Sequence, residues 1–205
     1  MTDEKKPMVF VIDDDKALRD GLQLLLESLS LDVACFASTR EFMAFARPDV
    51  PSCLVLDVRM PVQNGLDFQQ QLARDGIDIP IVFISGHGDI PISVRAMKAG
   101  AIEFLSKPFR EQELLDAIDL GLRRDRDRRE EVARNAALRA AYAALSAGEK
   151  DVLARVARGL PNRQIADELG VSEITVKVRR GHIMRKLSAA TLADLVEMAI
   201  TLGLR

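Results

Sequence analysis

Residues 53–56 read CLVL, an apolar run that is followed at once by the acidic residue Asp57. Similar runs precede polar residues at 8–12 (MVFVI), 80–84 (PIVFI) and 101–105 (AIEFL), and a weaker run occurs at 32–36 (DVACF). Short apolar runs bounded by polar residues are typical of strands in the interior of a parallel sheet. The sequence therefore predicts five short strands in its first half.

Helical patterns lie between these predicted strands. Five leucines, at positions 18, 22, 25, 26 and 29, recur at the period of one helix face. Shorter stripes of the same kind follow at 42–45, 66–72, 94–98 and 114–122. Strands that alternate with helices form a parallel sheet that is covered by helices on both faces. We therefore predict an α/β fold, a doubly wound five-stranded parallel sheet, for the first half of the chain.

The ends of the predicted strands carry polar side chains. In an open parallel sheet, chemistry collects at the carboxyl ends of the strands. Four of these ends supply five candidate site residues: Asp13, Asp14, Asp57, Ser85 and Lys107. Each of these residue types alone is common in helix caps and turns. If the first, third and fourth strands are neighbours, three carboxylates share one pocket with a hydroxyl and an ammonium group.

Three carboxylates in one pocket repel one another unless a cation lies among them. Carboxylate oxygens suit Mg²⁺, which keeps several waters in proteins and often accompanies phosphate groups. We therefore predict a Mg²⁺ site at which one carboxylate attacks a phosphoryl group. Lys107 would offset the charge that develops, and Ser85 would donate a hydrogen bond to the phosphoryl oxygens.

Residues 8–122 resemble the receiver domain of two-component response regulators, which has a flavodoxin-like fold. Four motifs carry the resemblance: IDDD (12–15), CLVLDVRMPVQNG (53–65), IVFISGHGD (81–89) and AGAIEFLSKPF (99–109). The resemblance implies that a sensor histidine kinase transfers a phosphoryl group to the carboxylate of Asp57. It also implies the ligands of the Mg²⁺ ion, which are Asp13, Asp14, Asp57 and the backbone carbonyl of Arg59.

The same resemblance implies a switch. Ser85 and Lys107 match the hydroxyl and the lysine that engage the phosphoryl group. Phe104 matches an aromatic residue that turns inward when the hydroxyl moves. A phosphoryl group adds charge and three strong hydrogen-bond acceptors, which draw such side chains inward. This movement would reshape the face made by residues 89–99 and 101–105, where we expect a homodimer to form after phosphorylation.

Charge is divided unevenly along the chain. Residues 1–120 contain 12 basic and 20 acidic side chains, a net charge of −8. Residues 121–205 contain 17 basic and 11 acidic side chains, a net charge of +6. An acidic half that is joined to a basic half predicts two modules with different partners.

The two halves meet in a segment of charged residues. Residues 123–131 read RRDRDRREE and carry no apolar side chain. Asp125 and Arg129 are opposite charges four positions apart, a spacing that supports a solvated helix. No proline interrupts residues 111–142. We predict one continuous helix over this range, with a flexible charged linker as the alternative.

The last third of the chain shows the pattern of four short helices. A capping box at 146–149 predicts the start of the first of them. Residues 162–169 and 173–187 read as two helices joined by a turn that contains a glycine, which predicts a helix-turn-helix. A fourth helix follows over about 189–202. We therefore predict an all-α four-helix domain over 145–205.

The second helix of this motif, 173–187, predicts a cationic face. Val176 and Ile183 are apolar and would point to the interior. The opposite face and its flanks carry eight residues: Thr175, Lys177, Val178, Arg179, Arg180, Gly181, Arg185 and Lys186. No acidic residue occurs between Ile174 and Thr191. A cationic stripe at this place in a helix-turn-helix fits the major groove of double-stranded DNA.

Residues 145–203 are similar to the LuxR-type helix-turn-helix, through LSAGEKDVL (145–153) and GLPNRQIADELGVSEITVKVRRGHIMRKL (159–187). Together with the receiver part, the whole chain resembles the FixJ group of response regulators. The resemblance implies that Lys177 and Val178 face DNA bases. It also implies contacts to the DNA backbone from Asn162, Thr175, Arg179, Arg180 and Lys186, and Arg185 shares the same exposed face.

The sequence departs from the LuxR-type pattern at three places. Gly148 stands where arginine is usual, Arg179 where histidine is common, and Gly181 where a contacting side chain sometimes occurs. These departures bear on which DNA sequence is read rather than on whether DNA is bound. The additional arginine predicts stronger attraction to phosphate and a steeper salt dependence.

These observations predict a phosphorylation-dependent transcriptional regulator, not an enzyme. We expect a receiver domain over 1–122, a helical linker over 123–144 and a LuxR-type DNA-binding domain over 145–205. No apolar run reaches the ~20 residues that span a bilayer, and the N-terminal residues show no secretory signal. We therefore expect a cytoplasmic protein without a membrane partner.

Three alternatives remain open from the sequence. A Mg²⁺-dependent phosphohydrolase of the haloacid dehalogenase type would need a second acid two residues after the nucleophile, where this chain has Arg59. A module that only takes up phosphoryl groups would not explain the cationic stripe on residues 173–187. A constitutively active DNA-binding protein would have no use for the set formed by Asp57, Ser85 and Lys107.

Overall fold

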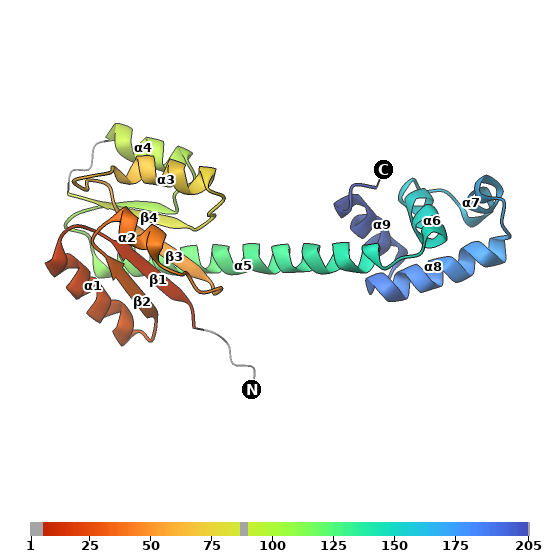
Figure 1. Ribbon diagram of the computed structural model, residues 1–205, viewed down its shortest axis with the longest axis horizontal. Coiled ribbons are helices and arrows are strands. Elements are labelled where there is room, and N and C mark those ends of the chain that lie inside the picture. The colour runs from red at the N-terminus through yellow and green to blue at the C-terminus, as the bar shows by residue number, and fades with distance from the viewer. Residues whose placement is uncertain (1–5, 87–89, 205) are drawn as a thin grey trace. The chain divides into compact units, whose positions relative to one another are not determined.

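The computed structural model describes residues 6–86 and 90–204, and Figure 1 labels the elements that they form. Strands and helices alternate first: β1 (Met8–Ile12), α1 (Lys16–Ser28), β2 (Asp32–Phe36), α2 (Thr39–Ala44), β3 (Ser52–Asp57), α3 (Gly65–Arg74), β4 (Ile81–Ser85), α4 (Ile90–Lys98), β5 (Glu103–Ser106) and α5 (Glu111–Ala143). Helices then follow: α6 (Ala147–Ala157), α7 (Asn162–Leu169), α8 (Glu173–Leu187) and α9 (Leu192–Thr201). The chain divides into two compact units, Met1–Arg129 and Glu130–Arg205, and α5 contributes to both.

The strands form one parallel sheet in the order β2-β1-β3-β4-β5. β1 pairs with β3 so that Ile12 lies beside Leu56, and β3 pairs with β4 so that Asp57 lies beside Ile84. The first, third and fourth strands are therefore neighbours, as the predicted site requires. The five predicted strands are confirmed, and their ends shift by at most two residues.

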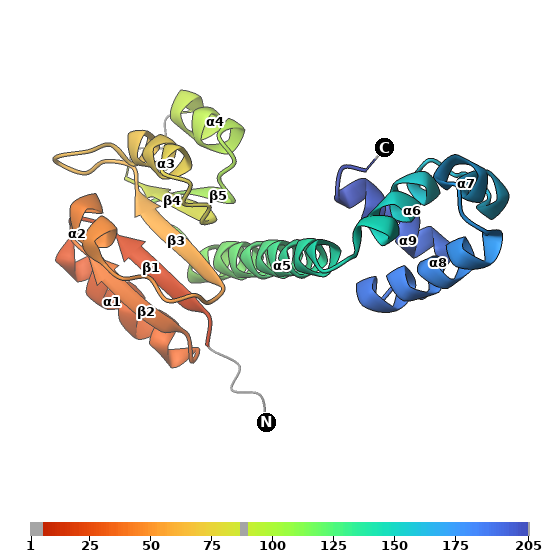
Figure 2. The same ribbon diagram turned by 45° about the vertical axis from the view of Figure 1, so that its right-hand side comes forward.

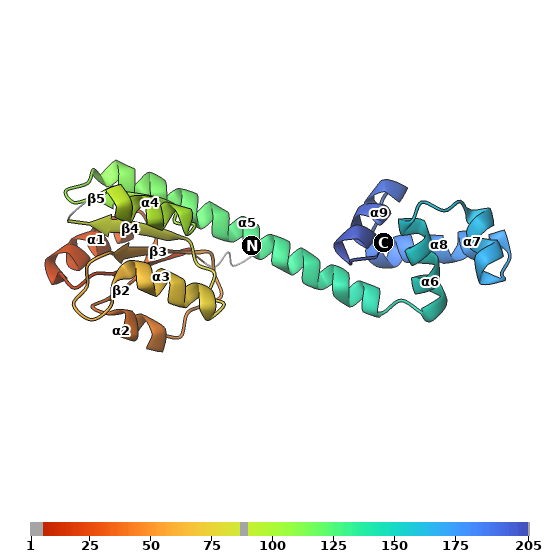
Figure 3. The ribbon, with the colours of Figure 1, turned by 90° about the horizontal axis from the view of Figure 1, so that it is seen from above.

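Helices cover both faces of this sheet. On one face, Leu26 of α1 and Leu114 of α5 share a core with Val55 of β3. On the other face, Phe42 of α2 and Phe68 of α3 pack edge to face, with 5.9 Å between their ring centroids. Figure 3 shows α5 on one side of the strands and α2 and α3 on the other. Strands that are covered on both faces need near-continuous apolar runs, which explains the pattern in the sequence.

α5 and β3 approach each other closely at one point. A Cβ atom on Gly121 of α5 would lie 2.6 Å from Sγ of Cys53 on β3, so only a residue without a side chain fits there. Cys53 is fully buried, and burial raises the pKa of its thiol to about 12. Cys53 therefore serves as a small apolar side chain that receives the helix.

A Gly121→Ala variant is expected to lose about 1–3 kcal/mol of unfolding free energy, because the added methyl group overpacks this contact. Urea unfolding followed by circular dichroism would measure the loss. Gly21→Ala is the matched control, since a methyl group added at Gly21 of α1 would have no neighbour within 4 Å, and alanine favours a helix. The same loss in a Cys53→Ala background would show that the Gly121–Cys53 contact is not the cause.

The charged segment 123–131 lies inside α5, so the structure has a helix there and not a flexible linker. In the second unit, α6 begins with the predicted capping box between Ser146 and Glu149. Figure 2 shows α7 leading into α8. Gly170, which ends α7, adopts the left-handed conformation that glycine tolerates. α9 begins later than the predicted residue 189, because Thr191 caps it.

The second unit has its own apolar core. Val176 and Ile183 of α8 are fully buried, as predicted, and they share the core with Val152 of α6, Ile165 of α7 and Leu195 of α9. This packing leaves the opposite face of α8 to solvent. Among the described residues, the helices are all too short or too polar to cross a membrane.

Candidate functional sites

Three acids meet at the carboxyl edge of the sheet. Asp13 follows β1 and Asp57 ends β3, and because these strands are neighbours the two carboxylates lie close together. Carboxylate oxygens of Asp13, Asp14 and Asp57 all lie within 4.8 Å of one another. Asp13 and Asp57 are buried, whereas Asp14 is exposed. The structure thus brings the three predicted acids together in a group of oxygen ligands that is able to hold a metal ion.

Lys107 joins the two buried acids. Its Nζ donates hydrogen bonds to Oδ2 of Asp13 at 2.6 Å and to Oδ1 of Asp57 at 3.1 Å. Burial raises the pKa of Asp57 above its ordinary value, although the hydrogen bond from Lys107 lowers it. Burial lowers the pKa of Lys107, but its hydrogen bonds to both acids outweigh this and raise it. The site therefore places three acidic side chains beside one lysine.

Backbone groups take the remaining oxygens of the buried acids. The N–H of Asp15 donates to Oδ1 of Asp13 at 2.8 Å, and the N–H of Arg59 donates to Oδ2 of Asp57 at 3.1 Å. Arg19 of α1 donates to the backbone carbonyl of Asp13 at 2.6 Å. The sequence analysis missed this contact, because the helical pattern of α1 indicates only which side chains face the core.

The predicted switch residues lie on the two neighbouring strands. Ser85 ends β4, is fully buried, and pairs in register with Ser106 of β5. Its backbone carbonyl accepts a hydrogen bond from the N–H of Lys107 at 2.7 Å. Phe104 is half-buried, with its ring centroid 6.3 Å from that of Phe83. Residues 87–89, which complete the IVFISGHGD motif, lie outside the described residues.

The predicted DNA-contacting residues fall into two groups. Lys177, Val178 and Arg185 are exposed on α8, opposite its buried Val176 and Ile183. The others make contacts inside the second unit, some to neighbouring helices and one, that of Thr175, to the residue that caps α8. The side chain of Thr175 lies 2.9 Å from that of Ser172, Arg180 donates to Asn162 of α7, and Lys186 pairs with Glu149 of α6.

Arg179 lies against Gly148, at the start of α6. A Cβ atom at position 148 would lie 2.8 Å from Cζ of Arg179. Two of the three departures from the LuxR-type pattern are therefore neighbours in space. The missing side chain at 148 leaves the room that the guanidinium group of Arg179 occupies. The sequence gives no sign of this pairing, since the two residues are far apart along the chain.

Glu149 is the main polar anchor of the second unit. Its side chain is buried and accepts hydrogen bonds from Nζ of Lys186 at 2.8 Å and from the N–H of Ser146 at 2.7 Å. These bonds, that from Lys186 above all, hold the pKa of Glu149 down at about 2, against an ordinary value of 4.5. The carboxylate of this anchor is therefore ionised at neutral pH.

The second unit is expected to lose stability as pH falls from 4.5 towards 2. A carboxylate with a depressed pKa stabilises the folded state fully only above its ordinary value, and this contribution disappears as the folded group becomes protonated. Fluorescence of Tyr142 reports on this unit alone, because the chain has one tyrosine and no tryptophan. The Glu149→Gln variant should lose less stability over the same range, and an equal loss would contradict the assignment.

Comparison with known families agrees with both halves of the chain. The family model for the response regulator receiver domain matches residues 9–119. A second model, for bacterial regulatory proteins of the luxR family, matches residues 143–199. These matches confirm the two resemblances that the sequence motifs indicated.

Whole-chain relatives join the same two parts. Nodulation protein W of Bradyrhizobium diazoefficiens is 54% identical over 199 residues, which cover 97% of this chain and 88% of that protein. The solved structure of response regulator StyR is 50% identical, with a TM-score of 0.83 over 95% of this chain and 98% of that one. Full-length FixJ from B. japonicum is 34% identical, with a TM-score of 0.56 over 97% and 98%. The chain therefore belongs to the response regulators that combine a receiver with a LuxR-type DNA-binding domain, a family of transcriptional regulators and not of enzymes.

Proposed function

We propose that Asp57 accepts a phosphoryl group from a sensor histidine kinase, and that this promotes dimerisation and sequence-specific binding to double-stranded DNA. The observation that carries the proposal is the placement of Asp57 between Lys107 and two further acids at one edge of the sheet. In this reaction an oxygen of Asp57 forms a bond to phosphorus, the bond from phosphorus to the histidine nitrogen breaks, and the freed imidazole takes up a proton.

The residues around Asp57 have distinct roles in this proposal. The N–H of Arg59 and Nζ of Lys107 orient the two oxygens of the nucleophile. Asp13, Asp14, Asp57 and the backbone carbonyl of Arg59 would hold Mg²⁺, a choice that the hard oxygen donors and their excess negative charge support. When bound, the ion would neutralise charge on the phosphoryl oxygens.

The response to phosphorylation would pass through β4 and β5. Ser85 and Lys107 would turn towards the phosphoryl oxygens, and Phe104 would turn inward beside them. The face of α4 and β5 would change with them. Ile90, Val94 and Met97 of α4 are exposed apolar side chains, and they suit a surface that is covered in a homodimer.

The second unit would then bind DNA in the cytoplasm through α8. Lys177 and Val178 would face bases, with Arg185 on the same face. Asn162, Thr175, Arg179, Arg180 and Lys186 would contact phosphates, in part through the network that already holds α8 in place. We propose a receiver over 1–122, a helical linker over 123–144 and a DNA-binding domain over 145–205.

The mass of the chain in solution tests the proposal. Beryllofluoride with Mg²⁺ mimics a phosphoryl group on an aspartate, and light scattering reports whether monomers become dimers. We expect a dimer with both reagents present and a monomer without them, and no change in an Asp57→Asn variant. An unchanged mass in the parent chain would remove dimerisation from the mechanism. A dimer in the Asp57→Asn variant would show that another site responds.

A further inference from the structure

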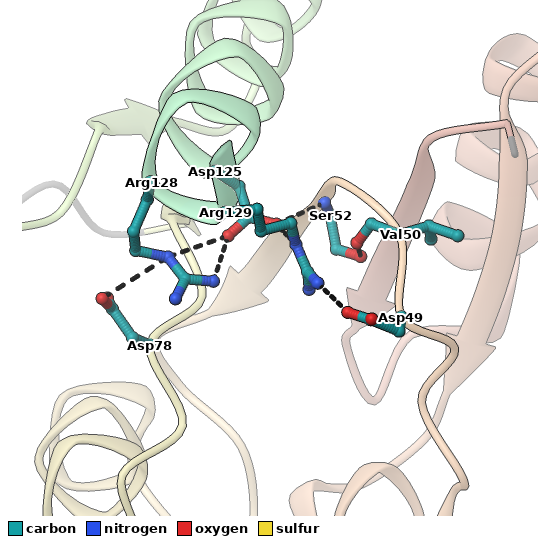
Figure 4. A network of polar contacts seen from close by, with 7 residues as sticks. All are labelled: Asp49, Val50, Ser52, Asp78, Asp125, Arg128 and Arg129. Carbon is teal, nitrogen blue, oxygen red and sulfur yellow. Dashed lines mark hydrogen bonds and ion pairs between the residues drawn. The ribbon is translucent and has the colours of Figure 1, made fainter. Parts of the chain in front are cut away.

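One acid of the charged segment is buried. Asp125 lies in α5 with only 1% of its surface exposed, among neighbours in the sequence that are nearly all charged. Its Oδ2 accepts a hydrogen bond from the N–H of Ser52, at the start of β3, at 2.9 Å. Figure 4 shows this contact between the helix and the first residue of the strand. The close contact of Gly121 with Cys53, one turn earlier, brings the helix near enough for it.

Two arginines complete the surroundings of this carboxylate. Arg128 donates to Oδ1 through Nη2 at 2.6 Å and through Nε at 3.1 Å, and Arg129 donates to Oδ2 through Nε at 2.6 Å. Both oxygens therefore take charge-assisted hydrogen bonds, the condition under which a buried carboxylate is stable. Asp125 with Arg128 and Arg129 is called the Asp125 clamp below.

The clamp reaches beyond the helix. Arg129 also bonds Asp49, in the loop before β3, and Nε of Arg128 lies 3.5 Å from Oδ2 of Asp78, in the loop before β4 (Figure 4). Both loops precede their strands, so they lie at the amino edge of the sheet, opposite the acidic cluster. The clamp thus ties α5 to the receiver at the end that is remote from Asp57.

The clamp lies at the place in the sequence where the receiver ends. The receiver family model ends at residue 119, and the first compact unit ends at Arg129, the last residue of the clamp. Residues 123–131 have no apolar side chain that could dock this stretch of helix on the sheet. A helix that is held only by its own hydrogen bonds is marginal in water. The hydrogen bonds and ion pairs of the clamp therefore dock this stretch of α5 on the first unit.

We propose that Asp125, Arg128 and Arg129 are positioning residues, which hold the start of the linker helix on the receiver so that phosphorylation of Asp57 can control the DNA-binding unit. The clamp would keep residues 123–131 of α5 helical and held on the first unit. The rearrangement of the receiver is then transmitted mechanically and is not lost in a flexible segment. The second part of this proposal rests on the proposed function, whereas the first part does not.

Hydrogen exchange of the full-length chain tests the first part. In an Asp125→Asn variant, the amides of residues 123–135 are expected to exchange about tenfold faster or more, because the two arginines lose their carboxylate. Asp127→Asn is the matched control, since it removes the same charge from an exposed position two residues away. Arg129→Gln, which removes one of the two arginines that bond Asp125, should give a smaller increase in the exchange rate. Unchanged exchange in Asp125→Asn would overturn the proposal.

DNA binding tests the second part, with a duplex that is selected in vitro for binding to the parent chain. Beryllofluoride and Mg²⁺ should increase the affinity of the parent chain and of Asp127→Asn. Asp125→Asn should keep the basal affinity and the beryllofluoride-dependent dimer but lose most of the increase. A full increase in this variant, together with faster exchange, would overturn the role in coupling. A parent chain that does not respond would instead reject the proposed function and leave the exchange result standing.

Discussion

An Asp57→Asn variant is expected to take up no phosphoryl group and at the same time to become more stable than the parent chain. Asparagine offers no carboxylate oxygen to form a bond with phosphorus, so uptake from a small phosphodonor should vanish in intact-protein mass spectra. The variant should gain unfolding free energy at neutral pH without divalent cations, because burial, which raises the pKa of Asp57, no longer acts on a charged group. Loss of function with gain of stability would exclude misfolding as the cause.

The sign of the stability change follows from the pKa of Asp57. Burial raises this pKa above 3.8, although Lys107 lowers it, so the ionised carboxylate is less favourable in the folded chain than in the unfolded chain. This cost is full near neutral pH and disappears as the pH falls below 3.8. The advantage of the variant should therefore shrink on acidification. Asp127→Asn, at an exposed position, should change neither property, and a lower stability of Asp57→Asn would show that its pair with Lys107 dominates.

A Lys177→Ala variant is expected to bind its DNA site about 10–100-fold more weakly and to discriminate less at one base position. An Arg179→Ala variant should instead weaken binding to all duplexes alike and reduce the slope of log affinity against log salt by about 1. The two variants are expected to differ because, in the proposed function, Lys177 would face bases and Arg179 would contact phosphate. Fluorescence anisotropy at several salt concentrations, with the selected duplex and a scrambled one, would separate these effects.

Arg139→Ala is the control for both DNA-binding variants. Arg139 is an exposed cation of the same unit that lies on α5 and not on α8. Its removal should change affinity by less than about twofold, because a cation away from the DNA contributes only through the general field. A loss in Arg139→Ala equal to that in Lys177→Ala would mean that net charge, and not the face of α8, determines binding.

Much of the fold follows from local patterns. The apolar runs predict the strands because each strand is covered on both faces, and the capping signals predict the starts of the helices. The acidic cluster can also be predicted from the sequence. Asp13, Asp57 and Lys107 each follow a predicted strand, and in a parallel sheet such ends meet at one edge. The roles assigned to Ser85, Phe104 and the face of α8 stay predictions until the variants are measured.

Local sequence patterns do not predict the contacts between segments that are far apart along the chain. The four-residue spacing predicts the pair between Asp125 and Arg129, and the structure confirms it at 2.6 Å. The spacing also suggests a solvated helix, and this is wrong for Asp125, because its burial depends on Ser52, 73 residues earlier. Lys186 is a similar case, because its hydrogen-bond partner Glu149 lies 37 residues earlier in the sequence. Local periodicity carries no information on such pairs.

The continuity of α5 has a consequence for the length of the linker. Each residue added to an α-helix advances the chain by about 1.5 Å and turns the remainder of the chain by about 100°. One residue inserted after the clamp would therefore turn every later side chain of this helix by about 100°, although it lengthens the helix by only about 1.5 Å. An insertion of seven residues, about two full turns, would return those side chains close to their original face of the helix. Relatives with an unbroken helix here should therefore differ in linker length by helical periods, whereas those with a flexible linker can vary freely.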